Sequence, residues 1–278
     1  MRTVRLPNGT QVPALGQGTW RMGEGQRSAA EEAACPRLGI DLGMTLIDTA
    51  EMYGDGAAEQ VVAEAIAGQR DRVFLVSKVY PHNAGKKAAV LACESSLKRL
   101  KTDRIDLYLL HWRGSVPLAE TVAVFEHLRR EGKLRHWGVS NLDTDDMEEL
   151  LGVPGGDACA ANQVLYTPDH RGIEFDLLPW QAARGIPAMA YSPVGLGGRL
   201  LRNPALVAAA ARHAATPAQI AIAWSLRRPD VISIPKAGSA GHVRENARAA
   251  DIVLTAEDLA AIDTAFPPPR RKQPLAML

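Results

Sequence analysis

The fold is indicated by residues 73–112, which read VFLVSKVYPHNAGKKAAVLACESSLKRLKTDRIDLYLLHW. The stretch opens with the apolar run VFLVSK and closes with the apolar run IDLYLLHW, and both have the branched and aromatic residues that strands favour. The run between them, Lys86–Leu100, is typical of a helix. A strand, a helix and the return turn need about 30 residues, so this stretch predicts one right-handed βαβ unit.

The same unit recurs in both directions along the chain. Strand-like runs begin at Gly16 (GQGTW), Thr45 (TLIDTA), Val73, Ile105, Leu134 (LRHWGVSN), Cys159 (CAANQVLY), Ile186 (IPAMAYSP) and Val231 (VISIPK). Helix-like runs lie at Ser28–Leu42, Ala57–Ala67, Lys86–Leu100, Leu118–Arg130, Thr144–Leu151, Phe175–Arg184 and Pro217–Arg227. Eight such units in one chain most simply close into an α/β fold of the (β/α)8 TIM barrel type, with an open doubly wound sheet as the alternative.

Three segments fall outside the repeat. Asn8-Gly9 lies between two short alternating runs, which predicts an N-terminal β-hairpin that plugs one end of the barrel. The long interval before the last strand predicts a loop with a short added helix over Leu196–Ala215. A final helix and a tail follow, and the tail after Phe266 is expected to run extended over the surface. No linker separates two parts, so residues 1–278 are expected to form a single domain.

Composition and charge narrow the class of protein. The 278 residues carry 32 Lys+Arg and 31 Asp+Glu, a net charge of +1, which argues against a nucleic-acid surface or a polybasic membrane anchor. The 3 cysteines are widely spaced and form no C-x-x-C motif, which fits a reducing compartment. The first residues lack the apolar stretch of a signal peptide, and no run is long enough to span a membrane. We expect a soluble cytoplasmic protein without membrane or nucleic-acid partners.

Chemically capable side chains gather where the predicted strands end. They are Asp48 with Tyr53, Lys78, His111 with Trp112, Ser140-Asn141, Asn162-Gln163, Tyr191-Ser192, and Lys236. In a barrel these ends converge on the face where the active sites of this architecture lie. Residues that are distant in the sequence are therefore expected to be neighbours.

A lysine at the end of a buried strand is costly unless a carboxylate faces it, and Asp48 is the natural partner of Lys78. Tyr53 follows in the next turn, where its hydroxyl could point back to the ammonium group. A neighbouring cation is expected to lower the pKa of a phenol and so to favour proton donation. His111 could orient a substrate carbonyl or share its proton.

Seven short motifs then carry a resemblance that spans the whole chain. They are DTAEMYG (48–54), SK (77–78), LHW (110–112), GVSN (138–141), NQ (162–163), YSP (191–193) and IPK (234–236). In this order they resemble the aldo-keto reductases, and within that family the short bacterial members that reduce methylglyoxal and other small aldehydes. The resemblance implies NADPH, rather than NADH, as coenzyme, a small carbonyl compound as substrate, and a monomer or weak homodimer.

The resemblance also implies site residues. The catalytic residues would be Asp48, Tyr53, Lys78 and His111. The coenzyme would contact Gly18, Thr19, Trp20, Asp48, Ser140, Asn141, Gln163, Tyr191, Ser192, Pro193, Val194, Gly195, Leu196, Gly197, Lys236, Ala237, His242, Arg244, Glu245 and Asn246. The substrate would contact Trp20, Tyr80, His82, His111 and Trp112.

The chain departs from the family at the phosphate-binding end. Many members follow the lysine of IPK with Ser or Thr and carry an Arg six positions after it, whereas this chain has Ala237 and His242. Arg244 is expected to substitute for that arginine. No G-x-G-x-x-G fingerprint is complete, and no His or Cys residues have metal-ligand spacing, so we expect no metal.

Three functions of different classes remain open from the sequence. The first is an NADPH-dependent carbonyl reductase in which Tyr53 protonates the carbonyl oxygen. The second is a cofactor-binding regulatory or redox-sensing barrel subunit. The third is a barrel isomerase or aldolase with Lys78 as a Schiff base, which would need a desolvated lysine without a close carboxylate.

Overall fold

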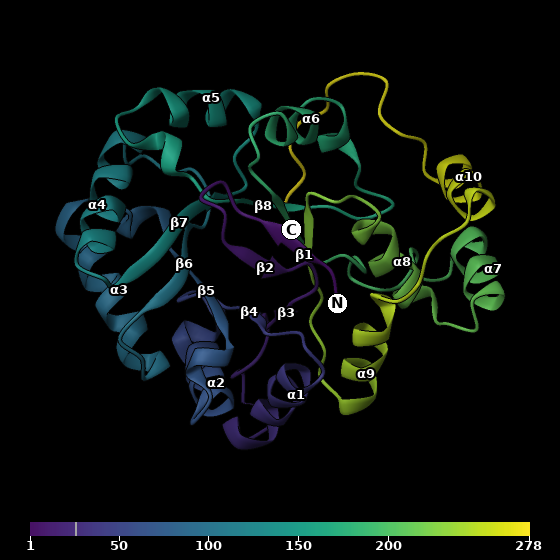
Figure 1. Ribbon diagram of the computed structural model, residues 1–278, viewed down its shortest axis with the longest axis horizontal. Coiled ribbons are helices and arrows are strands. Elements are labelled where there is room, and N and C mark those ends of the chain that lie inside the picture. Colours follow the sequence, from purple (N-terminus) through teal and green to yellow (C-terminus); the bar gives the residue numbers. More distant parts are fainter. Residues whose placement is uncertain (26) are drawn as a thin grey trace.

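A ring of eight parallel strands forms the centre of the computed structural model, which describes residues 1–25 and 27–278 (Figure 1). The strands are β3 (Gln17–Gly18), β4 (Leu46–Asp48), β5 (Phe74–Val79), β6 (Ile105–Leu110), β7 (Leu134–Ser140), β8 (Asn162–Leu165), β9 (Ala188–Tyr191) and β10 (Val231–Ile234). Each strand pairs with the next one in the chain, from β3 to β10. Parallel bridges from Leu15 to Ser233 and from Gly18 to Lys236 join the two ends of the sheet. The predicted barrel is confirmed, and the open sheet is excluded.

Helices surround this ring (Figure 1). They are α1 (Ala29–Asp41), α2 (Ala57–Ile66), α3 (Lys86–Leu100), α4 (Leu118–Arg130), α5 (Thr144–Gly152), α6 (Leu177–Ala182), α7 (Pro204–Arg212), α8 (Pro217–Leu226), α9 (Ala240–Ala249) and α10 (Ala256–Ala265). The predicted bounds of α3 and α4 are correct, whereas α6 is shorter than predicted at both ends. The helix expected within Leu196–Ala215 is α7.

The N-terminal hairpin fills one end of the barrel. Strands β1 (Thr3–Arg5) and β2 (Gln11–Pro13) pair antiparallel, and Gly9 in the turn has a φ of 92°, a conformation that glycine adopts without strain. The buried side chains of Val4, Leu6 and Val12 belong to the same apolar cluster as the interior barrel residues Val76 and Leu107. In Figure 1 the hairpin lies across the middle of the ring. The expected plug is therefore present.

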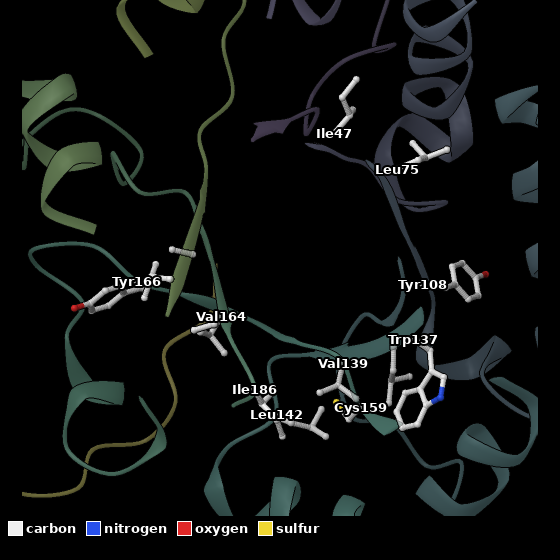
Figure 2. Packing of buried hydrophobic residues seen from close by; sticks show 14 of the residues in the cluster. Ile47, Leu75, Tyr108, Trp137, Val139, Leu142, Cys159, Val164, Tyr166 and Ile186 are labelled. Carbon is white, nitrogen blue, oxygen red and sulfur yellow. The ribbon is translucent and has the colours of Figure 1, made fainter. Parts of the chain in front are cut away.

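A second apolar layer lies between the strands and the helices. Tyr108 and Trp137 point outward from the ring in Figure 2. Phe125 of α4 packs between them, with ring centroids 5.5 Å from Tyr108 and 5.9 Å from Trp137. The indole nitrogen of Trp137 donates a hydrogen bond of 2.7 Å to Glu126 on the same helix. These contacts explain why α4 is fixed against β6 and β7.

The C-terminal tail does not follow its predicted course over the surface alone. In Figure 1 it leaves α10, arcs past α6 and ends near the middle of the ring. Lys272 forms ion pairs with Asp143 (3.0 Å) and Asp176 (2.6 Å), which stand at the start of α5 and α6. Met277 and Leu278 then reach the cavity at the carboxyl ends of the strands. Across the part of the chain that the structure describes, no helix is long and apolar enough to cross a membrane.

Candidate active site

A cavity of about 640 Å³ opens at the carboxyl ends of the barrel strands. A volume of this size suits a small-molecule ligand. Its wall contains Gly18, Trp20, Arg21, Asp48, Met52, Tyr53, His111, Trp112, Ser140, Asn141, Gln163, Tyr191, Ser192, Pro193, Val194, Gly195, Leu196, Gly197, Ile234, Lys236, Met277 and Leu278. The barrel thus brings together most of the residues that the sequence placed at strand ends.

The floor of the cavity contains a buried ion pair. The Lys78 ammonium lies 2.8 Å from Asp48 Oδ2, and the two side chains are 0% and 4% exposed. The same ammonium donates to the carbonyl oxygen of Thr49 at 2.9 Å and to the hydroxyl oxygen of Tyr53 at 3.0 Å. An ammonium group has three hydrogens, and all three therefore have an acceptor.

The charge state of Lys78 follows from these partners. Burial by itself lowers the pKa of an amine, but the charge of Asp48 and the hydrogen bonds to Asp48 and Tyr53 outweigh it, so the pKa of Lys78 is raised. A lysine that is charged and fully hydrogen-bonded is a poor nucleophile. This geometry argues against the Schiff-base isomerase or aldolase.

Tyr53 is held over the ion pair by a tight turn. It begins a short 3-10 segment, Tyr53–Gly56, in which Gly54, Asp55 and Gly56 all have positive φ angles of 56°, 52° and 86°. Its hydroxyl oxygen accepts a hydrogen bond from Lys78, so the hydroxyl hydrogen remains free for another acceptor. Tyr53 lines the cavity, and an acceptor bound there could receive that hydrogen.

The expected direction of the Tyr53 pKa needs correction. Burial raises the pKa of the phenol, and although the charge of Lys78 acts to lower it, as predicted, the net pKa is raised. The reason is that loss of hydration disfavours the phenolate more than one cation, itself paired with Asp48, favours it. Tyr53 therefore stays protonated at neutral pH, as a proton donor must.

His111 follows β6 and faces Tyr53 across the cavity. The two ring centroids are 5.8 Å apart in an edge-to-face arrangement, and Trp112 packs 4.8 Å from the imidazole on another side. Burial, aided by the charge of Lys78, lowers the pKa of His111 to about 2. The ring is therefore neutral at physiological pH and can donate one hydrogen bond but carries no charge.

Polar side chains from β7, β8 and β9 extend the network around the cavity. The Tyr191 hydroxyl donates to Asn141 Oδ1 at 3.0 Å, and Asn141 Nδ2 donates to Ser140 Oγ at 3.1 Å. Ser140 Oγ donates to the backbone oxygen of Gln163 at 2.9 Å, and Gln163 Nε2 donates to Asp48 Oδ1 at 2.7 Å. The side chains are thus oriented by one another from Tyr191 to the buried ion pair.

A glycine-rich segment after β9 forms the far wall. Ser192, Gly195 and Gly197 have positive φ angles of 48°, 60° and 76°, so the segment curls closely around this side of the cavity. Leu196, within this segment, is 70% exposed. Lys236 follows β10 at the same side, and no carboxylate pairs with it in the described ranges 1–25 and 27–278.

Several predicted coenzyme and substrate residues do not line the cavity. Thr19 is fully buried, and its hydroxyl donates to the backbone oxygen of Asp48 at 2.9 Å, so it holds β3 to β4. Tyr80 lies behind Trp112, with ring centroids 6.0 Å apart, and its other side stacks on His82 at 4.8 Å. Tyr80 and His82 are thus joined to the wall through Trp112 and are not among the residues that line the cavity, so their expected contact with substrate stays a prediction.

The predicted residues around α9 also lie beyond the cavity wall. Ala237 packs in an apolar cluster with Val243, and Asn246 is buried in α9. Arg244 lines a separate hollow with Met1 and Leu42, and its expected role in place of the missing arginine stays a prediction. The full set is Ala237 in the turn before α9 and His242, Arg244, Glu245 and Asn246 on the helix itself. Their directions depend on how α9 is rotated about its axis, which the sequence motif does not specify.

Other wall residues were not predicted. Arg21 stacks its guanidinium on the neighbouring Trp20 ring at 4.7 Å, and Met52 precedes Tyr53 in the same turn. Met277 and Leu278 come from the tail. Arg21 directly follows Trp20, and this position could have suggested that it lines the cavity. No periodic pattern in the sequence indicates where an extended tail ends.

Comparison with known proteins gives the family. The Aldo/keto reductase family model matches residues 14–266. The chain belongs to the aldo/keto reductase family. It is 50% identical to methylglyoxal reductase YeaE of Escherichia coli K12 over 100% of this chain and 99% of that protein. It is 33% identical to a glyoxal reductase of Bacillus subtilis over 94% of this chain and 91% of that protein.

A solved structure of an aldo/keto reductase has the same fold as this family member. The aldo/keto reductase of Klebsiella pneumoniae, in complex with NADP and acetate, superimposes with a TM-score of 0.97 at 53% identity. The match covers 100% of this chain and 99% of that chain. In the described residues, no three His, Cys, Asp or Glu side chains are grouped in a way that could hold a metal ion.

Removing one partner of the buried ion pair should destabilise the fold. We expect Lys78→Met to reduce the free energy of unfolding by about 3 to 5 kcal/mol, because Asp48 is left buried without its cation. The double variant Asp48→Asn with Lys78→Met should be more stable than Lys78→Met alone. Urea unfolding of the three proteins measures this, and a double variant no more stable than the single one would contradict the coupling.

His111 should make the protein sensitive to acid. The unfolded chain binds a proton at His111 near pH 6.5, whereas the folded protein does so only near pH 2, so the stability contributed by the neutral ring is lost as the pH falls below 6.5. Between pH 7 and pH 5, the wild type should lose about 2 kcal/mol more than His111→Gln. His127→Gln, at an exposed site, is the control. Equal losses in wild type and His111→Gln would show that this histidine is not the cause.

Proposed function

We propose that the protein reduces small aldehydes, ketones or α-dicarbonyl compounds of the methylglyoxal kind to alcohols, with NADPH as coenzyme and Tyr53 as general acid. The observation that carries the proposal is the Tyr53 hydroxyl, which accepts a hydrogen bond from a buried Lys78 and keeps its own hydrogen for a ligand in the cavity. The named functions of the two similar reductases point to the same substrates.

The cavity has the features that a nicotinamide dinucleotide requires. Tyr191 offers an aromatic face beside Asn141 and Ser140, whose polar atoms suit a carboxamide. The curled segment 192–197 suits a pyrophosphate, because positive φ angles at its glycines allow a close approach of the backbone. Lys236 provides a cation without a carboxylate partner in the structure's described part. Residues from the barrel centre to its rim therefore fit the extended shape of the coenzyme.

In the proposed reaction, the side chains of the protein donate the proton and hold the donor in place. When bound, reduced nicotinamide supplies the hydride for the carbonyl carbon. Tyr53 gives its hydroxyl hydrogen to the carbonyl oxygen, so that one hydride and one proton turn the carbonyl into an alcohol. The charged Lys78, 3.0 Å from the Tyr53 oxygen, stabilises the phenolate that this transfer leaves. Asp48 keeps Lys78 charged throughout.

His111 positions the substrate. A neutral imidazole beside Tyr53 can donate one hydrogen bond to the same carbonyl oxygen, which fixes that oxygen and polarises the bond. A protonated His111 would compete with Tyr53 as acid, and its depressed pKa prevents this. Tyr53 is then the group with a proton to give.

The remaining wall selects small substrates. Trp20, Met52 and Trp112 contribute apolar side chains to the cavity that Tyr53 lines, and Met277 and Leu278 of the tail add to the same wall.

The three cysteines are free and buried, which fits a reducing compartment. We infer that the protein acts in the cytoplasm, as a monomer or weak homodimer.

Tyr53→Phe tests the general acid. The variant keeps the ring and loses only the hydroxyl. Turnover of methylglyoxal with NADPH should therefore fall by about 100-fold to 10,000-fold, which is the usual contribution of a general acid. NADPH binding, followed by fluorescence, should be nearly unchanged. Near-normal turnover would refute the assignment. A wild-type protein that binds NADPH but reduces no carbonyl compound would favour the regulatory subunit instead.

Trp20→Ala tests the substrate wall. Removing the indole should raise KM for methylglyoxal and improve the relative rate with a bulky aryl ketone, since the cavity gains space near Tyr53. Trp180→Ala is the matched control, because Trp180 lies on α6 and outside the cavity. The wall assignment fails if the ratio of the two substrates is the same in all three proteins.

A further inference from the structure

Two exposed cations lie near the turn that follows β10, at the proposed phosphate-binding end of the site. Lys236 follows β10 on the exposed rim of the cavity, where a parallel bridge pairs it with Gly18 of β3. Arg27 comes from the opposite end of the sequence, in the segment before α1. Neither forms an ion pair with any residue in the described ranges 1–25 and 27–278.

The fold places these two cations around one residue. Arg27 Nη1 donates a hydrogen bond of 2.7 Å to the carbonyl oxygen of Gly238, across 211 positions of the sequence. A Cβ atom added to Gly238 would lie 3.3 Å from Lys236 Nζ. The ammonium and the guanidinium therefore both lie next to Gly238, in the short turn between β10 and α9.

The buried thiol of Cys35 is influenced by both cations. Burial raises its pKa, and Arg27 and Lys236 are the two charges that oppose this rise. Both positive charges thus lie within electrostatic reach of one group on α1.

The nearby acidic residues are bonded to the backbone, and the pKa of Glu31 is lowered first by its hydrogen bonds with Ser28 and to a smaller degree by the charge of Arg27. Glu31 accepts a hydrogen bond of 2.9 Å from the backbone of Ser28 at the start of α1. Glu32 accepts one of 2.6 Å from the backbone of Gly23. Both carboxylates hold the segment in place, and the guanidinium of Arg27 remains available for a ligand.

We propose that Arg27 and Lys236 together bind the 2'-phosphate of NADPH, an inference that rests on the proposed function. Arg27 thereby supplies a guanidinium near the place where this chain has Ala237 and His242 instead of the Ser or Thr and the Arg that many family members carry. A guanidinium has five N–H donors, and the bond to Gly238 uses one of them, so a planar pair remains for two phosphate oxygens. Because the phosphate carries nearly two negative charges, two cations match it.

Equilibrium binding of NADPH and NADH, measured by fluorescence for each protein, tests the proposal without relying on turnover. Arg27→Ala should raise the Kd for NADPH about tenfold or more and leave the Kd for NADH within about twofold. Arg27→Lys, which keeps the charge but loses the planar fork, should fall between wild type and Arg27→Ala. The loss should also shrink at high salt, because exposed charges are screened.

Arg37→Ala is the matched control, because it removes one exposed arginine of α1 whose guanidinium contacts the backbone of Glu64. It should change neither Kd. An Arg27→Ala protein that keeps its full preference for NADPH, or that loses both coenzymes equally, overturns the inference while the proposed reductase stands. A wild-type protein that binds neither coenzyme overturns both.

Discussion

The buried ion pair between Lys78 and Asp48 is the constraint on which the site depends. Each charge is removed from water, and breaking such a pair by losing one partner costs about 3 to 5 kcal/mol. The two side chains come from neighbouring strands, so the pair also fixes how β4 and β5 present their ends. The third proton of Lys78 then determines where the Tyr53 hydroxyl lies.

The hydrogen bonds of the cavity extend from this pair. One carboxylate oxygen of Asp48 accepts a hydrogen bond from Lys78, and the other accepts one from Gln163. This single carboxylate therefore links β5 with β8 across the barrel. Ser140 and Gln163 are register partners in neighbouring strands, which explains why the polar chain continues to Asn141 and Tyr191. The proposed acid and the proposed coenzyme residues therefore share one rigid support.

The proposed coenzyme end of the cavity is built differently. There the wall consists of irregular segments, which are the curled segment after β9 and the turn after β10, and the segment that carries Arg27 is bonded to that turn. Such segments are positioned by hydrogen bonds between distant parts of the chain rather than by the strand register. This difference makes the proposed phosphate-binding end the part of the site that sequence motifs describe least well.

The sequence by itself determined the eight strands, the order of the helices, the N-terminal hairpin and the residues at the strand ends. It could do so because hydrophobic periodicity and strand-ending positions are local, and a barrel converts the carboxyl ends of its strands into one surface. Only the tertiary structure decided that the Thr19 hydroxyl bonds the backbone of Asp48, that Tyr80 packs against Trp112 and that Arg244 lines a separate hollow. It also brought the tail to the cavity and Arg27 to the turn after β10. The physical reason is that side-chain direction in loops, and the path of an extended tail, depend on contacts between residues far apart in the chain, which no local pattern records.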